Sequence, residues 1–138
     1  MPTSHKNKTL ATFLALVFGA IGVHRFYLRG AHDRLGLLHV CCLPIAGIVQ
    51  GAGHGPNVFW VLLPLLVSAI IGDIEALVIG VTPDEKWDAR HNLSSGRTSR
   101  TSWVVALLLV ATMLIGTTML IGTISRLFDL VFTGGAYG

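Results

Sequence analysis

Four apolar stretches, each close to the length of a membrane-spanning helix, constrain this chain more than any other feature. They cover Thr9 to Leu28, residues 35–53, residues 58–81 and residues 103–125. A helix needs about 20 mostly apolar residues to cross the hydrocarbon core of a bilayer, and the third and fourth stretches meet that length. The first is uninterrupted only as far as Val23. The second holds His39, Pro44 and Gln50, so it could span the membrane, lie at its surface or re-enter.

Composition supports the same class of protein. Hydrophobic residues make up 52% of the 138 residues and charged residues 12%, against about 25% charged in a soluble domain. We therefore expect an all-α integral membrane protein, an antiparallel helical bundle of three to four transmembrane helices plus a short interfacial helix. The expected parts are a membrane domain at 6–92 (helices at about 9–28, 35–53 and 58–81, interfacial helix at 83–92), a linker at 93–102, and an additional transmembrane helix with its tail at 103–132.

The expected interfacial helix has a start signal. Thr82-Pro83-Asp84-Glu85 has the pattern of a capping box with proline at the first helical position. In that pattern the Thr82 hydroxyl accepts from the Glu85 amide, and Glu85 reaches back to the Thr82 amide. Trp87 would hold the helix at the level of the lipid headgroups.

The positions of the basic residues predict an orientation. If all four stretches cross, seven lysines and arginines share one side and three share the other. The seven are Arg25, Arg29, Arg34, Lys86, Arg90, Arg97 and Arg100, and the three are Lys6, Lys8 and Arg126. If the second stretch does not cross, the split falls to six against four. The positive-inside rule thus favours four crossings, with the two basic loops in the cytoplasm and both termini outside.

Small residues form possible packing surfaces on the first and last stretches. Gly19 and Gly22 belong to a stripe on the first, and Thr112 and Gly116 belong to a stripe on the last. Small residues let helix backbones approach closely in lipid, where dispersion drives association. The pattern favours helix–helix packing, either within one chain or between chains.

Residues 19–30 (GAIGVHRFYLRG) carry a resemblance to a known family. With Lys6 and Lys8 before them, they resemble the signature of the two-transmembrane-helix (TM-two) domain family. Residues 73–77 (DIEAL) and 82–92 (TPDEKWDARHN) are similar to the later segments of bacterial members. The resemblance implies a bacterial-type member with an extra C-terminal transmembrane helix. That family has no agreed biochemical activity, so the resemblance bears on the fold rather than on the function.

The motif His24-Arg25-Phe26-Tyr27 would lie at the membrane interface, where it can act in two ways. Arg25 can bond to a lipid phosphate or to a carboxylate of a neighbouring helix, and the two aromatic residues suit the interface. The motif can equally be a charged turn that stops translocation.

Asp73 and Glu75 are acidic residues inside the third stretch, where an unpaired charge is costly. Two positions apart on a helix, they point about 200° from each other and cannot form an acid–base pair. Glu75 and Arg25 fall at similar depths. We therefore expect Arg25 to pair with Glu75, and Asp73 to face another helix or a polar cavity.

Two classes of function remain. The first is a structural or interaction module, a membrane anchor or assembly partner, because the strongest signals are packing stripes and interface anchors. The second is a homo-oligomeric channel or an ion or proton pathway lined by Asp73 or Glu75. We expect no enzyme activity, no metal and no cofactor. The expected partners are the lipid bilayer and a second copy or another membrane protein, with no nucleic acid. The expected location is the bacterial cytoplasmic membrane.

Overall fold

The computed structural model describes residues 5–52 and 57–137, and the regular structure in this part of the chain is helical. The elements are α1 (Lys8–Phe18), the 3-10 turn η1 (Gly19–Ile21), α2 (Val23–Arg29), α3 (Arg34–Gly51), α4 (Val58–Val81), α5 (Asp84–His91) and α6 (Trp103–Thr133). Three of them, α3, α4 and α6, are long and apolar enough to cross a membrane. The predicted all-helical bundle is confirmed, with three candidate spans.

The first apolar stretch is not one helix, so the prediction of a single helix over residues 9–28 was wrong. Helix α1 has 11 residues and is therefore about 16 Å long, roughly half the thickness of the hydrocarbon core. It ends at η1, and Gly22 then adopts a left-handed conformation with φ 71°. The chain returns as α2, and the Asn7 amide donates to the Tyr27 hydroxyl at 2.8 Å. We call α1, η1 and α2 together the re-entrant hairpin.

Close contacts hold this turn against α4, which is a candidate membrane span. Backbone at membrane depth must be buried in protein with its polar groups bonded. Gly19 lies so near Gly72 of α4 that an added Cβ would stand 2.8 Å from the Gly72 Cα. The Ser68 hydroxyl donates to the Ala20 carbonyl at 2.6 Å, so the broken helix does not leave that acceptor unpaired. The positive φ at position 22 requires glycine.

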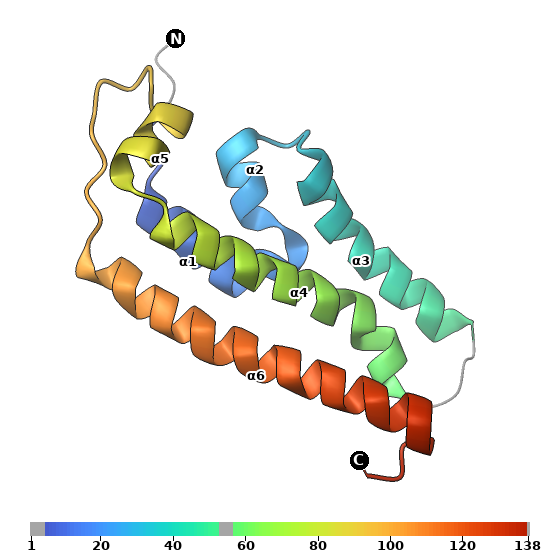
Figure 1. Ribbon diagram of the computed structural model, residues 1–138. Helices are drawn as coiled ribbons and strands as arrows, with labels where there is room; N and C mark the ends of the chain where they lie inside the picture. Colours follow the sequence, from blue (N-terminus) through green and yellow to red (C-terminus); the bar gives the residue numbers. More distant parts are fainter. Residues whose placement is uncertain (1–4, 53–56, 138) are drawn as a thin grey trace.

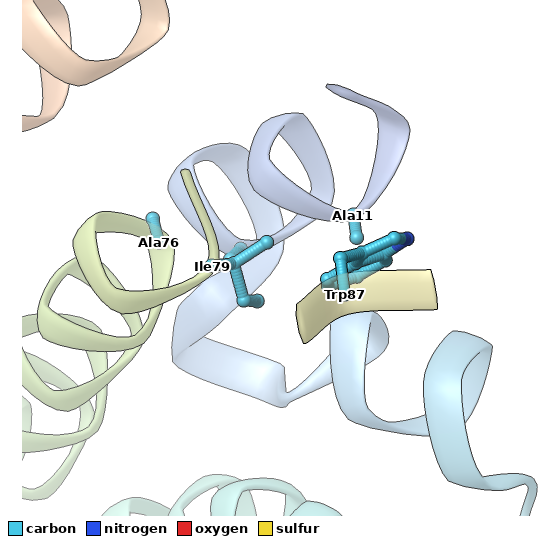
Figure 2. Packing of buried hydrophobic residues seen from close by; sticks show 5 residues of the cluster. Ala11, Ala76, Ile79 and Trp87 are labelled. Atoms are coloured by element: carbon cyan, nitrogen blue, oxygen red, sulfur yellow. The ribbon is translucent and has the colours of Figure 1, made fainter. Parts of the chain in front are cut away.

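Helix α4 lies in the middle of the molecule, with α3 along one side and α6 along the other (Figure 1). The buried apolar cluster is small and lies near the C-terminal end of α4. There Trp87 of α5 packs beside Ala11 of α1, close to Ile79 and Ala76 of α4 (Figure 2). Trp87 is 1% exposed, and its indole nitrogen donates to the Lys6 carbonyl at 3.0 Å. Trp87 thus fixes α5 to α1 and α4 from inside the protein, and the expectation that it would sit among lipid headgroups was wrong.

One end of the molecule gathers the N-terminal segment, the α2–α3 loop, α5 and the linker, whereas the C-terminus lies at the other end (Figure 1). The Lys6 amide donates to Asn92 at 2.7 Å, which joins the N-terminal segment to the end of α5. We call residues 5–8, 25–34 and 82–102 the basic end. It holds nine of the ten lysines and arginines, and only Arg126 lies toward the opposite end.

This arrangement corrects the four-crossing topology. The re-entrant hairpin enters and leaves at the basic end, so Lys6 and Lys8 join the other basic residues instead of opposing them. The charge split becomes nine against one, in place of the expected seven against three. The start of α1 and the end of α6 lie at opposite ends of the molecule, because three long helices run its length rather than four (Figure 1).

The predicted capping box is also absent. Helix α4 continues to Val81, so Thr82 caps its C-terminal end, and the Thr82 hydroxyl donates back to the Val78 carbonyl at 2.6 Å. Helix α5 begins at Asp84 without a side-chain cap. The Asp84 carboxylate instead accepts from the Thr101 amide at 2.7 Å and so holds the linker beside α5.

Candidate functional site

The most concentrated polar chemistry within the membrane region joins α2 to α4. The Nε of Arg25 donates to Glu75 Oε2 at 2.9 Å, and a second guanidinium nitrogen contacts Oε1. The two side chains are 15% and 18% exposed. A two-pronged contact between a guanidinium and a carboxylate is the strongest type of ion pair in proteins. The pair that we expected between Arg25 and Glu75 is therefore present in the structure.

His24 joins the same carboxylate from the neighbouring position on α2. Its Nε2 contacts Glu75 Oε2, and the side chain is 1% exposed. The Nδ1 atom is buried and has no hydrogen-bond partner among the described residues. The Glu75 carboxylate thus bonds to both His24 and Arg25.

Asp33 links this cluster to the start of α3. It is the N-cap of α3, and its Oδ2 accepts from the Gly36 amide at 2.8 Å. Arg25 reaches the same oxygen at 3.5 Å, and Arg29 reaches the other at 3.4 Å. We call His24, Arg25, Asp33 and Glu75 the ionic cluster. Sequence reasoning missed Asp33, although an aspartate just before an apolar helix is a known N-cap signal.

A second polar chain lies deeper, where the re-entrant turn meets α3 and α4. His39 Nδ1 bonds to the Ser68 hydroxyl at 2.7 Å, and that hydroxyl donates to the Ala20 carbonyl. The rings of His39 and His24 meet edge to face with centroids 6.1 Å apart. Neither His39 nor Ser68 has a sequence signal, because the contact depends on how three separate elements pack.

Phe26 and Tyr27, the other two residues of the interface motif, pack beside these polar groups. A Cβ added to Gly36 would lie 2.8 Å from the Phe26 ring, so Phe26 closes onto α3. Tyr27 accepts from Asn7, and the Lys6 ammonium lies 4.8 Å from its ring centroid. Tyr27 therefore joins the two ends of the re-entrant hairpin, whereas Phe26 packs the hairpin against α3.

Asp73 points away from the ionic cluster, toward α6. It is 5% exposed, and its Oδ2 has no hydrogen-bond partner among the described residues. It lines a cavity of about 210 Å³ together with Thr112, Gly116 and Thr117 of α6. A Cβ added to Gly116 would lie 3.2 Å from that same Oδ2. The Thr112 hydroxyl donates to the Leu108 carbonyl of the same helix at 2.7 Å. Because Thr112 and Gly116 both lie beside Asp73, the small stripe of α6 faces α4 within the chain.

A third polar group holds the N-terminal segment to α5 and the linker. The Lys8 ammonium donates to the Thr82 carbonyl at 2.9 Å, to Asp84 at 2.5 Å and to the Thr101 hydroxyl. Lys8 is 5% exposed. We call this group the Lys8 clasp. Hydrogen bonds from Lys8 and Thr101 lower the pKa of Asp84 to about 2.

A comparison with protein families identifies a match at the N-terminal part of the chain. The TM2 domain model matches residues 4–51, which include the re-entrant hairpin and α3. The ionic cluster is completed from outside that match, because Glu75 lies on α4. No curated protein and no solved structure matches the chain. Over residues 4–51 the chain is therefore similar to the TM2 domain family, within a helical protein that has three candidate membrane spans.

Proposed function

We propose that this chain is a structural or interaction module of the membrane, an anchor or assembly partner, and not an enzyme. The observation that carries the proposal is the ionic cluster. Arg25 and His24 both bond to Glu75, so these polar groups hold α2 against α4 and are not free to exchange partners with an ion or a substrate. Buried polar groups that bond to one another specify a unique packing.

The outer face of α6 supports the assembly role. Large apolar side chains recur there, mostly at spacings of three, four or seven residues, and each is more than two-fifths exposed. They are Leu107, Val110, Leu114, Ile121, Ile124, Phe128 and Val131. A seven-residue repeat of this kind suits packing against another transmembrane helix. The proposed partners are therefore the lipid bilayer and a second copy or another membrane protein.

The alternative is an ion or proton pathway, and one observation favours it. Asp73 Oδ2 is buried without a partner among the described residues, in a cavity that also holds Thr112 and Thr117. A lone carboxyl group in a membrane span is a usual mark of transport. The cavity lies between α4 and α6 of a single chain, on the opposite face of α4 from Glu75.

Flux measurements in liposomes separate the two functions. Full-length chain would be reconstituted at a known density, and proton and K⁺ flux would be compared with protein-free liposomes and with Asp73→Asn. The structural role predicts that wild type, variant and empty liposomes give equal flux. Flux in the wild type that disappears in Asp73→Asn would replace the proposal with the pathway. The assembly role is tested by disulfide cross-linking of Leu114→Cys in a chain without Cys41 and Cys42. The control is Leu109→Cys, because the Leu109 side chain packs against Gly80 of α4 within the chain.

We also propose an orientation and a lineage. The nine-to-one charge split supports placing the basic end in the cytoplasm. The resemblance of residues 82–92 to bacterial sequences supports a bacterial-type member in the cytoplasmic membrane. In this proposal α4, α5 and α6 extend the TM2 domain and supply the carboxylate that fixes its hairpin.

A further inference from the structure

A pocket of about 190 Å³ opens at the basic end between α2, α4 and α5. Its polar lining consists of Arg25, Arg29 and Glu75 with Arg90, His91 and His24. Three guanidinium groups therefore surround a space that contains one carboxylate. Since both Glu75 oxygens already bond to α2 side chains, the pocket has an excess of positive charge.

Two of these arginines have bonding capacity left. The Arg29 side chain is 47% exposed, and its one ion pair, to Asp33, is long at 3.4 Å. Arg90 is exposed, and its side chain makes no hydrogen bond or ion pair with the described residues. Each guanidinium is a planar fork of donors that suits the oxygens of a phosphate or a carboxylate. The N–H donors of Arg29 and Arg90 that have no partner thus line the same pocket.

The surroundings of His91 show how closely the positive charges gather. Burial first, and then the charges of Arg90, Arg29 and Lys6, lower the pKa of His91. The His91 ring also lies against Trp87, with centroids 4.4 Å apart, so it is held in place. Like charges repel one another unless an anion lies among them. This grouping, with Glu75 already bonded to α2 side chains, would favour a further anion in the pocket.

We propose that this pocket binds a phosphate group. The arginine forks of Arg29 and Arg90 would hold its oxygens. The pocket opens at the basic end, where clustered basic residues suit contact with lipid headgroups, and Leu28 and Ile79 line its apolar side. A phospholipid headgroup is therefore the nearer source of the phosphate, and a soluble phosphate is the other. This inference goes beyond the structural role and does not depend on it.

The test uses full-length chain in dodecyl maltoside, a detergent without phosphorus. One arm adds dioleoyl phosphatidic acid and measures its Kd by native mass spectrometry. Its control is dioleoylglycerol, which has the same tails without the phosphate. The other arm adds inorganic phosphate, with chloride at equal ionic strength as its control, and records the Tm. Each arm compares wild type with the double variant Arg29→Gln/Arg90→Gln. The matched control is Arg97→Gln/Arg100→Gln, which removes the same charge from the linker.

We expect phosphatidic acid to bind wild type and dioleoylglycerol not to bind. The Arg29→Gln/Arg90→Gln variant should weaken the Kd about tenfold, and the linker variant by no more than about twofold. Arg90→Gln alone should weaken it by about threefold, and it removes no hydrogen bond or ion pair among the described residues. A rise in Tm with inorganic phosphate alone, lost in the double variant, would support the site and assign a soluble source. Equal binding by wild type and the double variant, or equal weakening in both double variants, would overturn the proposal.

Discussion

Gly19 and Gly72 meet backbone to backbone, the first in the re-entrant turn and the second near the middle of α4. A Cβ on Gly72 would lie 2.5 Å from the Gly19 Cα, which is closer than real Cβ contacts allow. This contact lets the turn settle against α4, so that the next residues of the hairpin can reach Glu75. The depth of the re-entrant hairpin therefore depends on two residues without side chains.

The first prediction concerns that contact. Gly72→Ala should lower the free energy of unfolding by about 1–3 kcal/mol, because the extra methyl group forces the hairpin away from α4. Gly47→Ala is the matched control, since Gly47 also lies inside a spanning helix but an added Cβ would meet nothing within 4 Å. Thermal unfolding in a mild detergent would compare them. Equal stability of the two variants would count against the close packing.

Gly116 offers a similar test for α6. Gly116→Leu should weaken the packing of α6 on α4, because its Cβ would lie 3.2 Å from Asp73 Oδ2 and 3.3 Å from the Asp73 Cβ. We expect a loss of about 1–3 kcal/mol in the free energy of unfolding. Gly122→Leu should have little effect, because an added Cβ there meets nothing within 4 Å. The midpoint of unfolding in denaturing detergent measures both, and a smaller loss for Gly116→Leu than for Gly122→Leu would refute the contact.

The Lys8 clasp should respond to acid. The ordinary pKa of an aspartate is near 3.8, and the folded-state pKa of Asp84 is lowered to about 2 by hydrogen bonds from Lys8 and Thr101. A lowered pKa means that the stabilisation is fully present above the unfolded value and is lost as pH falls through the folded value. The clasp should therefore weaken between about pH 4 and pH 2. Trp87 fluorescence with Trp60→Phe and Trp103→Phe would follow it, and Asp84→Asn should abolish the transition.

Membrane topology gives the next prediction. An N-terminal tag and a label on Ser95→Cys, in a chain without Cys41 and Cys42, should be accessible from the same side of the membrane. A C-terminal tag should be accessible from the other side. Protease protection of sealed vesicles reads the tags, and an impermeant maleimide reads the cysteine. If both tags report the same side, the four-crossing arrangement is correct and the re-entrant hairpin is not.

The spanning helices could be predicted because length and apolarity alone identify them. Helices α3, α4 and α6 begin and end within a few residues of their expected positions, apart from the longer end of α6. The Arg25–Glu75 contact could be predicted because a charge inside the membrane needs a partner at its own depth.

The break in the first stretch could not be predicted by the same reasoning. Glycines late in a transmembrane helix are compatible with close packing of a continuous helix, and residues 19–22 fit that pattern. Tertiary contacts decide between a continuous and a broken helix. Gly72 of α4 lets the turn approach closely, and the Ser68 hydroxyl donates to the Ala20 carbonyl. His39 was missed for a related reason, since its partner Ser68 lies on another helix. Asp33 was missed although its position before α3 is a local N-cap signal.

A double-mutant cycle on the free energy of unfolding tests most directly whether the Arg25–Glu75 ion pair holds α2 against α4. Arg25→Ala and Glu75→Ala should each cost about 3–5 kcal/mol, because either change removes the two-pronged partner of a largely buried charge. Glu75 then keeps only His24, and Arg25 keeps only its 3.5 Å contact with Asp33. Arg29→Ala, on the same helix but 47% exposed, should cost no more than about 1 kcal/mol. The account predicts that the double variant loses much less than the sum of the two single losses. Strict additivity of the two losses would contradict it.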